Sequence, residues 1–379
     1  MTSMPLAVVL FATFLVVYTL ILYPLLLVLL RRFRWRPIAR APITPTVSVI
    51  IAVHNGAVFL PDKIRSIMNL EYPAELLQVI VASDGSTDTT VELASQFDVV
   101  SVLNLPRGGK CAALNAAISC ATGEILLLTD VRQTLEPDSL RLLVRNFADP
   151  CVGAVSGLLK IRAGPDAESR ETGAYWRYES LIRDCLSSID SIFGASGAFY
   201  ALRRSLAVPI PPDILLDDMY LPLAAFRRGY RLIFDTDAIF WDFPTNRATE
   251  FRRKVRTLAG NFQLWAYCPW LLTPANRLLW HFLSYKVARL FLPWLLAAIF
   301  IASWLLPAPW KWLYLAPQII AYSLAALHSH LPSAIQRISS PLRTFCVMMI
   351  ATVFALRILF TPARDLWLVP GPSSFPPGG

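Results

Sequence analysis

The first long apolar stretch covers residues 5–30 and contains no charged side chain. It exceeds the roughly 20 apolar residues that a helix needs to cross a bilayer. No basic side chain precedes it, as a signal peptide would require, so we expect an uncleaved anchor. Because arginines gather on the cytoplasmic side of a span, the amino terminus is predicted to lie outside. The arginines that follow the stretch are Arg31, Arg32, Arg34, Arg36 and Arg40.

A different pattern begins at Val47, where residues 47–53 form a short, almost wholly apolar segment typical of a strand buried on both faces. Apolar segments of similar length then alternate with helical patterns. The further strands are expected at residues 77–82, 99–103 and 125–128, and the helices at 63–70, 89–97 and 111–121. This alternation predicts an α/β fold with a parallel, doubly wound sheet whose ligands bind beyond the carboxyl ends of the strands.

Long apolar stretches return after Gly260. Residues 276–286 mix aromatic, leucine and basic residues, as an interfacial helix does, and residues 290–306, 312–327 and 344–360 are expected to cross the membrane. We therefore predict four spans, with Arg337 and Arg343 inside and an external, flexible tail at 370–379. His328 and His330 are expected in a solvated loop rather than a metal site. The predicted parts are an anchor with its basic flank at 1–36, a cytoplasmic domain at 37–260 and a membrane part at 261–379.

The composition agrees with a membrane protein. Of 379 residues, 55% are hydrophobic and only 16% charged, and the mean hydropathy is +0.50. The net charge of +9 is concentrated beside the apolar spans, so we expect membrane lipids rather than nucleic acid as its counterpart. The six cysteines show no CxxC spacing, which indicates reduced, mostly buried thiols.

Polar residues follow each of the four predicted strands. Asn55 follows the first strand, Asp84-Gly85 the second, a Gly-Gly-Lys110 segment the third and Asp130 the fourth. Asp84 has the chemistry to accept hydrogen bonds from a base or ribose, and Lys110 at a helix start suits phosphate. Each residue alone is equally explained as a turn or a cap. Their shared position at the strand ends predicts one ligand-binding crevice.

Two adjacent carboxylates, Asp217 and Asp218, open a further amphipathic helix. Adjacent negative charges cost free energy unless a helix N-terminus, a cation or a proton balances them. The pair is explained either by catalysis or by N-capping.

Six segments, in this order, resemble the motifs of membrane-bound family 2 glycosyltransferases, over Val47 to about Gly260. They are Ser48 to Asn55, Ser83 to Asp88, Gly109 to Asn115, Asp130, Gly194 to Phe199, and Asp217-Asp218. The resemblance implies a GT-A fold, which is a Rossmann-like nucleotide-diphospho-sugar transferase domain. It also implies a nucleotide-sugar donor, UDP-linked by family expectation, and an inverting transfer by direct displacement.

The resemblance also implies roles for single residues. Val53, Asn55 and Asp84 would line the nucleotide with Lys110 near it, and Asp130 would bind the divalent cation, Mg²⁺ or Mn²⁺, with the diphosphate. Asp218 would be the general base that takes the proton of the acceptor hydroxyl. Asp217 would raise the basicity of Asp218 or hold the helix start. Gly197 would let the acceptor approach the backbone closely.

The chain departs from the family pattern at two places. The usual Asp-x-Asp is Asp130-Val131-Arg132 here, so Arg132 either contacts the diphosphate or points outward while Asp130 and donor oxygens hold the metal. Where processive members carry Gln-x-x-Arg-Trp, this chain has Arg253 and Arg256 without the glutamine and tryptophan. These two arginines would bind the acceptor or diphosphate, or lie against lipid headgroups.

The function expected from these features is transfer of a sugar to a lipid-linked or growing saccharide acceptor at the cytoplasmic face of the inner membrane. One alternative is a processive polysaccharide synthase with coupled export. An alternative of another class is an inactive nucleotide-binding scaffold or transporter component. Retention of Asp84 together with the Asp217-Asp218 pair argues against an inactive domain.

Overall fold

The computed structural model describes residues 3–161, 168–243 and 247–366, which form two compact units. The sheet unit comprises Leu30–Pro165 and Glu179–Pro244. The helical unit comprises Met1–Leu29, Asp166–Tyr178 and Thr245–Gly379. Helices α2 (Tyr23–Arg34) and α7 (Glu168–Ile189) have residues in both units.

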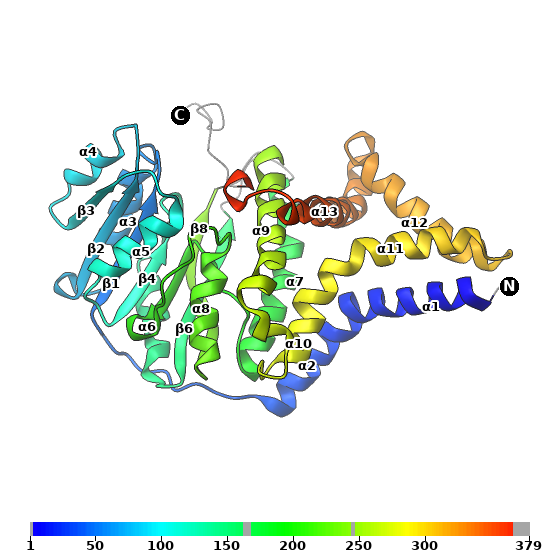
Figure 1. Ribbon diagram of the computed structural model, residues 1–379, viewed down its shortest axis with the longest axis horizontal. Coiled ribbons are helices and arrows are strands. Elements are labelled where there is room, and N and C mark those ends of the chain that lie inside the picture. Colours follow the sequence, from blue (N-terminus) through cyan, green and yellow to red (C-terminus); the bar gives the residue numbers. More distant parts are fainter. Residues whose placement is uncertain (1–2, 162–167, 244–246, 367–379) are drawn as a thin grey trace. The chain divides into compact units, whose positions relative to one another are not determined.

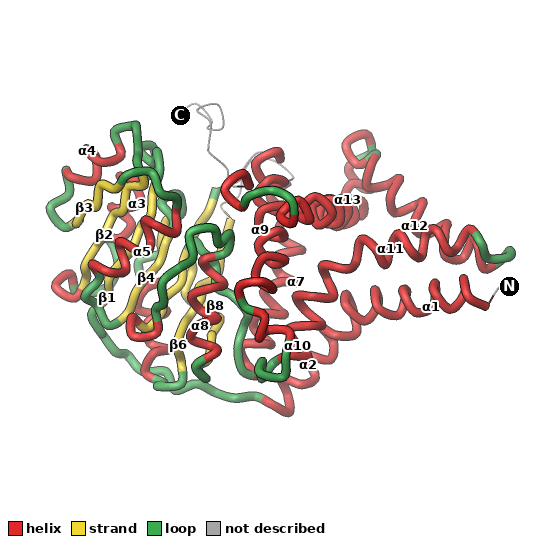
Figure 2. Tube along the Cα trace, viewed as in Figure 1, coloured by secondary structure: helices red, strands yellow, loops and turns green. Residues whose placement is uncertain are grey.

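The sheet unit is built on one eight-stranded sheet with the strand order β3-β2-β1-β4-β7-β6-β8-β5 (Figures 1 and 2). The strands are β1 (Val47–Val53), β2 (Leu77–Asp84), β3 (Val100–Leu105), β4 (Ile125–Thr129), β5 (Thr134–Leu135), β6 (Val152–Ile161), β7 (Phe199–Arg203) and β8 (Arg231–Asp242). The helices of this unit are α3 (Leu60–Met68), α4 (Thr90–Ser95), α5 (Lys110–Cys120), α6 (Ser139–Val144) and α8 (Asp217–Arg227).

Half of the sheet has the predicted parallel topology. Strands β3, β2, β1 and β4 pair in parallel, and β1 begins and ends at the predicted residues. The other half is mixed, because β7 pairs antiparallel with both β4 and β6, and β5 pairs antiparallel with β8. The doubly wound parallel arrangement is therefore correct only for the first four strands. The carboxyl ends of β1, β2 and β4 still meet at one edge.

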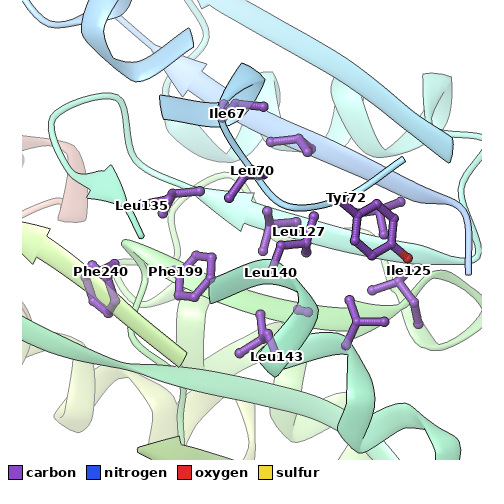
Figure 3. Packing of buried hydrophobic residues seen from close by; sticks show 14 of the residues in the cluster. Ile67, Leu70, Tyr72, Ile125, Leu127, Leu135, Leu140, Leu143, Phe199 and Phe240 are labelled. Carbon is purple, nitrogen blue, oxygen red and sulfur yellow. The ribbon is translucent and has the colours of Figure 1, made fainter. Parts of the chain in front are cut away.

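One hydrophobic cluster fixes this arrangement. It takes Val47, Val49, Ile51 and Val53 from β1, which alternate toward one face of the sheet. Helices α3 and α6 add leucines and isoleucines to the cluster. Figure 3 shows Ile67 and Leu70 beside Leu127 of β4, and Phe199 beside Phe240. Burying this apolar surface is the main term that stabilises the strand order.

The helical unit contains three helices that are long and apolar enough to cross a membrane, among the described residues. They cover Ser3–Arg34, Leu279–Trp304 and Ser333–Leu359. The unit's helices are α1 (Ser3–Val17), α9 (Arg247–Tyr267), α10 (Leu279–Phe282), α11 (Ala288–Trp304), α12 (Trp310–Ala326) and α13 (Ser333–Ala355). A π-helical turn at Tyr18–Leu22 joins α1 to α2, and another at Leu283–Val287 joins α10 to α11.

Three of the four predicted spans correspond to the three candidate helices, and the fourth stays a prediction. The stretch expected at 312–327 forms α12, whose 17 residues lie at the lower limit of the length that crosses a bilayer. The expected interfacial helix at 276–286 is not separate, because residues 279–304 form one continuous helix. Arg337 and Arg343 lie within the third candidate span rather than in a loop. The tail at 370–379 lies outside the described residues.

Two pairs of helices pack closely within the helical unit. Helix α1 lies along α11, with Val9 and Ala12 against Ile299 and Ala302 (Figure 1). Helix α9 lies along α13, where the rings of Phe251 and Phe354 meet edge to face at 6.0 Å. Small side chains such as Ala12 and Ala302 allow helix backbones to approach closely.

Candidate active site

The first two strand tips are tied together by Asn55. Its backbone has the left-handed φ of 52°, which asparagine tolerates better than most residues. Its side-chain oxygen accepts a hydrogen bond from the Thr87 N–H at 2.8 Å, and its own N–H donates to the Ser86 hydroxyl at 3.1 Å. Asn55 therefore orders the loop after β2. Val53, at the end of β1, is buried beneath this tip.

Asp84 ties the second tip to the third. Its buried carboxylate accepts hydrogen bonds from the N–H groups of Gly108 and Gly109 at 2.7 and 2.8 Å, and it pairs with Arg107. Gly85 has a φ of +61°, and a Cβ there would lie 2.8 Å from the Arg107 nitrogen. Only glycine allows this close approach. Asp84 thus organises the loop that leads into α5.

Lys110 joins two carboxylates from different parts of the chain. Its Nζ lies 3.3 Å from an oxygen of Asp130, at the tip of β4, and 3.3 Å from an oxygen of Asp217, at the start of α8. The Asp217 side chain is only 5% exposed, whereas that of Asp130 is 41% exposed. A cation between two acids balances part of their negative charge. Lys110 and Asp130, which the sequence placed in one crevice, therefore lie together, and Asp217 lies beside them.

Helix α5 also holds the segment that precedes the acidic pair. The Asn115 side chain donates to the Ile210 carbonyl at 2.8 Å and accepts from the Ile210 N–H at 2.9 Å. The Cys111 thiol donates to the Ile214 carbonyl at 3.4 Å. The spacing of Lys110, Cys111 and Asn115 thus aligns one face of α5 with residues 210–217.

The two adjacent aspartates occupy the first turn of α8, and Leu216, not an aspartate, is at the N-cap position. Asp217 is buried and Asp218 is partly exposed. An Oδ2 of Asp218 accepts a hydrogen bond from the Gly197 N–H at 3.0 Å, while its backbone carbonyl accepts from Ala195 at 2.9 Å. The helix N-terminus stabilises both negative charges. The simple capping interpretation of this pair does not hold.

Gly197 leaves room for the Asp218 carboxylate. A Cβ at this position would lie 2.9 Å from the Asp218 Oδ2, closer than van der Waals contact allows. The segment around it is held by the Ser156 hydroxyl, which accepts from the Ser196 N–H at 2.9 Å and from Arg183 at 2.9 Å. Gly197 thus lies directly against the carboxylate predicted to be the base.

Arg132 has a protein partner. Its guanidinium pairs with Asp242, at the end of β8, and the two side chains are only 16% and 12% exposed. The side chain therefore does not point outward into solvent. A contact between Arg132 and a diphosphate stays a prediction.

Arg253 and Arg256 belong to α9 in the helical unit, whereas the other candidate residues belong to the sheet unit. Both side chains are partly buried. Their contact with an acceptor stays a prediction.

The residues present suit a metal that is shared with a substrate. Among the described residues, no group of three or more His, Cys, Asp or Glu side chains forms a complete metal site. Asp130 does offer a half-exposed carboxylate at the strand tip. Mg²⁺ is commonly held by one or two carboxylates together with substrate phosphates. Asp130 fits that mode of binding.

Tyr200 was not expected from the sequence. It lies in β7 and is fully buried, and its hydroxyl has no hydrogen-bond partner within the described part of the chain. Burial, and then the nearby carboxylates of Asp217 and Asp218, raise the pKa of Tyr200 well above its usual range. In the sequence, Tyr200 stands inside the apolar strand Phe199–Arg203. It therefore looks like an ordinary core aromatic, and only its hydroxyl marks it as polar.

Comparisons with known proteins bear on the fold and on residues 48–207. Residues 48–207 match the model of Glycosyl transferase family 2. The probable glycosyltransferase YdaM of Bacillus subtilis (strain 168) is 27% identical over 238 residues, which is 57% of this chain and 55% of the relative. The poly-beta-1,6-N-acetyl-D-glucosamine synthase of Staphylococcus aureus (strain COL) is 26% identical over 231 residues, 58% of this chain and 55% of the relative.

The chain thus spans about half the length of the curated relatives that it matches. Among solved structures, the mannosyltransferase PcManGT from Pyrobaculum calidifontis in complex with GDP-Man and Mn²⁺ is 22% identical. It aligns with a TM-score of 0.70 over 93% of this chain and 99% of that one. This structural similarity supports a GT-A fold for the chain.

Proposed function

We infer that this chain, a glycosyltransferase of family 2 by its residues 48–207, moves a sugar from a nucleotide-diphosphate sugar onto a saccharide acceptor with inversion. The donor is UDP-linked by family expectation, and the acceptor is lipid-linked or a growing saccharide. The transfer takes place at the cytoplasmic face of the membrane.

The observation that carries this proposal is the position of the Lys110 ammonium between Asp130 and Asp217. A displacement reaction needs cationic character where the diphosphate departs and a carboxylate where the acceptor hydroxyl loses its proton. Lys110 links the strand tip that carries Asp130 to the helix that carries Asp218. Both requirements are therefore met by neighbouring groups of the sheet unit.

Asp218 is the proposed general base. It is the more exposed of the two adjacent aspartates, and the Gly197 N–H at 3.0 Å fixes one of its oxygens. The other oxygen then takes the proton from the acceptor hydroxyl as that hydroxyl attacks the anomeric carbon. The bond to the nucleotide diphosphate breaks on the opposite face of the sugar, which inverts the configuration. Asp217 is buried and paired with Lys110, so it holds the helix start and not the acceptor.

A divalent cation, Mg²⁺ or Mn²⁺, would be held by Asp130 together with diphosphate oxygens. When bound, it would neutralise negative charge on the departing diphosphate. Lys110 adds a second positive charge beside it. Asp84, Asn55 and Val53 would line the nucleotide, and Arg132 would stabilise the loop on the side of the diphosphate through its pair with Asp242.

The membrane is the proposed working place of the enzyme. The three candidate spans support an integral membrane protein, and the arginines after the first span support a cytoplasmic position for the sheet unit. Three of these arginines also have protein partners, since Arg31 pairs with Asp184, Arg36 with Asp190 at 2.8 Å and Arg40 with Asp235 at 3.8 Å. Arg253 and Arg256 are proposed to contact the acceptor or its lipid carrier. A bilayer-embedded enzyme suits an amphiphilic acceptor.

The test is to incubate the full chain in lipid with a panel of nucleotide sugars and membrane lipid extract, and to analyse the products by mass spectrometry. The proposal predicts a sugar-sized mass gain on a lipid or saccharide, with release of the nucleoside diphosphate. If no nucleotide sugar is bound or consumed, an inactive scaffold or transporter component is the better interpretation.

A processive polysaccharide synthase is a second candidate, favoured by the similarity to the poly-beta-1,6-N-acetyl-D-glucosamine synthase. The absence of the Gln and Trp around Arg253 and Arg256 argues against it. Product length separates the two candidates. Addition of one or two sugars supports single transfer, and a long polymer supports the synthase.

A further inference from the structure

We propose that Lys63 is a buried positioning residue that locks the Asp130 turn and the Gly197 segment of the active site into one arrangement. This proposal rests on the function proposed above for Asp130 and Asp218. It assigns to α3, a helix distant in sequence from both segments, a part in holding the reacting groups.

Lys63 stands at a position that packing alone would give to an apolar residue. Helix α3 turns Leu60, Ile64 and Ile67 into the hydrophobic cluster of the sheet, and Lys63 lies on the same inward face with no exposed surface. Burying an ammonium group is costly unless hydrogen bonds and a nearby negative charge compensate for it. The compensating groups therefore show what this lysine does.

The groups that compensate the charge of Lys63 lie at the two ends of the turn that carries Asp130. The Lys63 Nζ donates to the Thr129 hydroxyl at 2.6 Å and to the Gln133 carbonyl at 2.9 Å. Thr129 is the last residue of β4, and Gln133 directly precedes β5. One ammonium group thus holds both ends of the turn that contains Asp130 and Arg132.

The Thr129 hydroxyl also connects Lys63 to the segment beside Asp218. Because the Thr129 hydroxyl accepts from Lys63, its single proton is available to the Ala198 carbonyl, to which it donates at 2.7 Å. The preceding residue, Gly197, donates its N–H to Asp218 at 3.0 Å. Lys63, Thr129, Ala198 and Gly197 therefore connect the turn of Asp130 to the carboxylate of Asp218.

The electrostatics agree with this role. Burial lowers the pKa of Lys63 to about 7, and Asp130 is the charged group that opposes the shift. A lysine kept only to fill the core would not need an acid of the site as its counter-charge.

The first test is hydrogen–deuterium exchange in the full, ligand-free chain. Four variants are compared: Lys63→Met, which removes the donors; Thr129→Val, which removes the hydroxyl; Thr129→Ser, which keeps it; and Arg65→Met, an exposed cation on the same helix. We expect exchange about tenfold faster in both 129–134 and 196–199 for Lys63→Met and Thr129→Val. Thr129→Ser and Arg65→Met should match the parent protein in both segments.

Turnover supplies the second readout. Misplacing the turn of Asp130 should lower kcat by about 100-fold and raise the Mn²⁺ concentration for half-maximal activity, in Lys63→Met and Thr129→Val but not in Thr129→Ser. The double variant should lose no more than either single one, because both break the same chain of contacts. If Lys63→Met does not fold, the contrast between Thr129→Val and Thr129→Ser carries the test alone.

Unchanged exchange in both segments would overturn the proposal, as would exchange raised equally over the whole sheet, which marks general loss of stability. The exchange measurement needs no substrate. If the proposed function fails, the exchange measurement still tests the Lys63 proposal. If the Lys63 proposal fails, transfer by Asp218 is unaffected.

Discussion

Lys110 is the shared counter-charge of two carboxylates. Its ammonium lies 3.3 Å from Asp130 and 3.3 Å from Asp217, so one cation compensates two carboxylates. A departing diphosphate would bring more negative charge to this place. The lysine is then drawn toward the diphosphate, because it is a compact point charge on a flexible stem.

Lys110→Met should lower kcat/KM by about 100-fold and weaken binding of the nucleoside diphosphate, since the cation near the departing group is lost. Steady-state kinetics and calorimetric titration with UDP measure the two effects. Lys160→Met, which removes an exposed lysine elsewhere in the sheet unit, should change neither. Wild-type turnover in Lys110→Met would remove this lysine from the mechanism.

The buried face of α5 gives a prediction that needs no substrate. Burial, and next the carboxylate of Asp217, raise the pKa of Cys111 to about 12. At pH 8 only about one molecule in 10⁴ then carries the reactive thiolate. A maleimide should therefore label the exposed Cys120 and Cys151 but leave Cys111 unmodified, as peptide mass spectrometry would detect. Equal labelling of Cys111 would contradict the packing of α5 on residues 210–217.

Residues with a local signal were predictable. Asn55, Asp84, Lys110 and Asp130 are polar groups that follow apolar strands, and the sheet topology brings such groups together. Lys63 and Tyr200 gave no comparable signal, because each is a polar group within an apolar pattern whose neighbours come from distant parts of the chain. Arg132 was recognisable from its motif, but its partner was not, because Asp242 is 110 residues away in sequence.

At the scale of elements, the start of α8 and the segment before β7 form one structural piece. The N–H of Gly197 holds Asp218, and the N–H of Ala195 holds its carbonyl. The helix N-terminus stabilises negative charge there, and the glycine leaves room for it.

Gly197→Ala should displace the Asp218 carboxylate, because the added Cβ would lie 2.9 Å from its Oδ2. We expect kcat to fall by about 10- to 100-fold, while the affinity for UDP stays within error because the proposed nucleotide contacts lie at other strand tips. Kinetics and UDP titration on the same preparation test this split. Ser196→Ala is the control, since it changes no backbone donor. Equal turnover of Gly197→Ala and the control would mean that Asp218 is not held as described.

The elements themselves were predictable to different degrees. Strand β1 is recognisable because a strand buried on both faces is continuously apolar, and its bounds agree with the prediction. Strands β6, β7 and β8 combine two antiparallel pairings and one parallel pairing between segments far apart in the chain. Which of them pair depends on tertiary contacts and not on local periodicity.

At the scale of the whole molecule, the number of spans decides on which side of the membrane each loop lies. Helix α12 has 17 residues, which lies at the lower limit of the length that crosses a bilayer. Hydropathy and length therefore leave open whether α12 is a fourth span.

A chain with three spans should keep both ends of α12 on one side of the membrane. Single cysteines placed by Pro307→Cys and Ser329→Cys, in a background with the exposed Cys120 and Cys151 changed to serine, should react with a membrane-impermeant maleimide from the same side. Labelling of intact and of opened membrane vesicles measures this. Reaction from opposite sides would mean that α12 crosses the bilayer.

The proposed transfer depends on the Asp218 carboxylate, which takes the proton of the acceptor hydroxyl. The most direct measurement is the transfer rate of Asp218→Asn in lipid, with UDP affinity and thermal unfolding measured on the same sample and Asp213→Asn, an exposed neighbouring acid, as the control. We expect transfer to fall by about 10²- to 10⁴-fold in Asp218→Asn alone, with fold and UDP affinity retained. Transfer by Asp218→Asn at the rate of the control would contradict the role of Asp218 as the base.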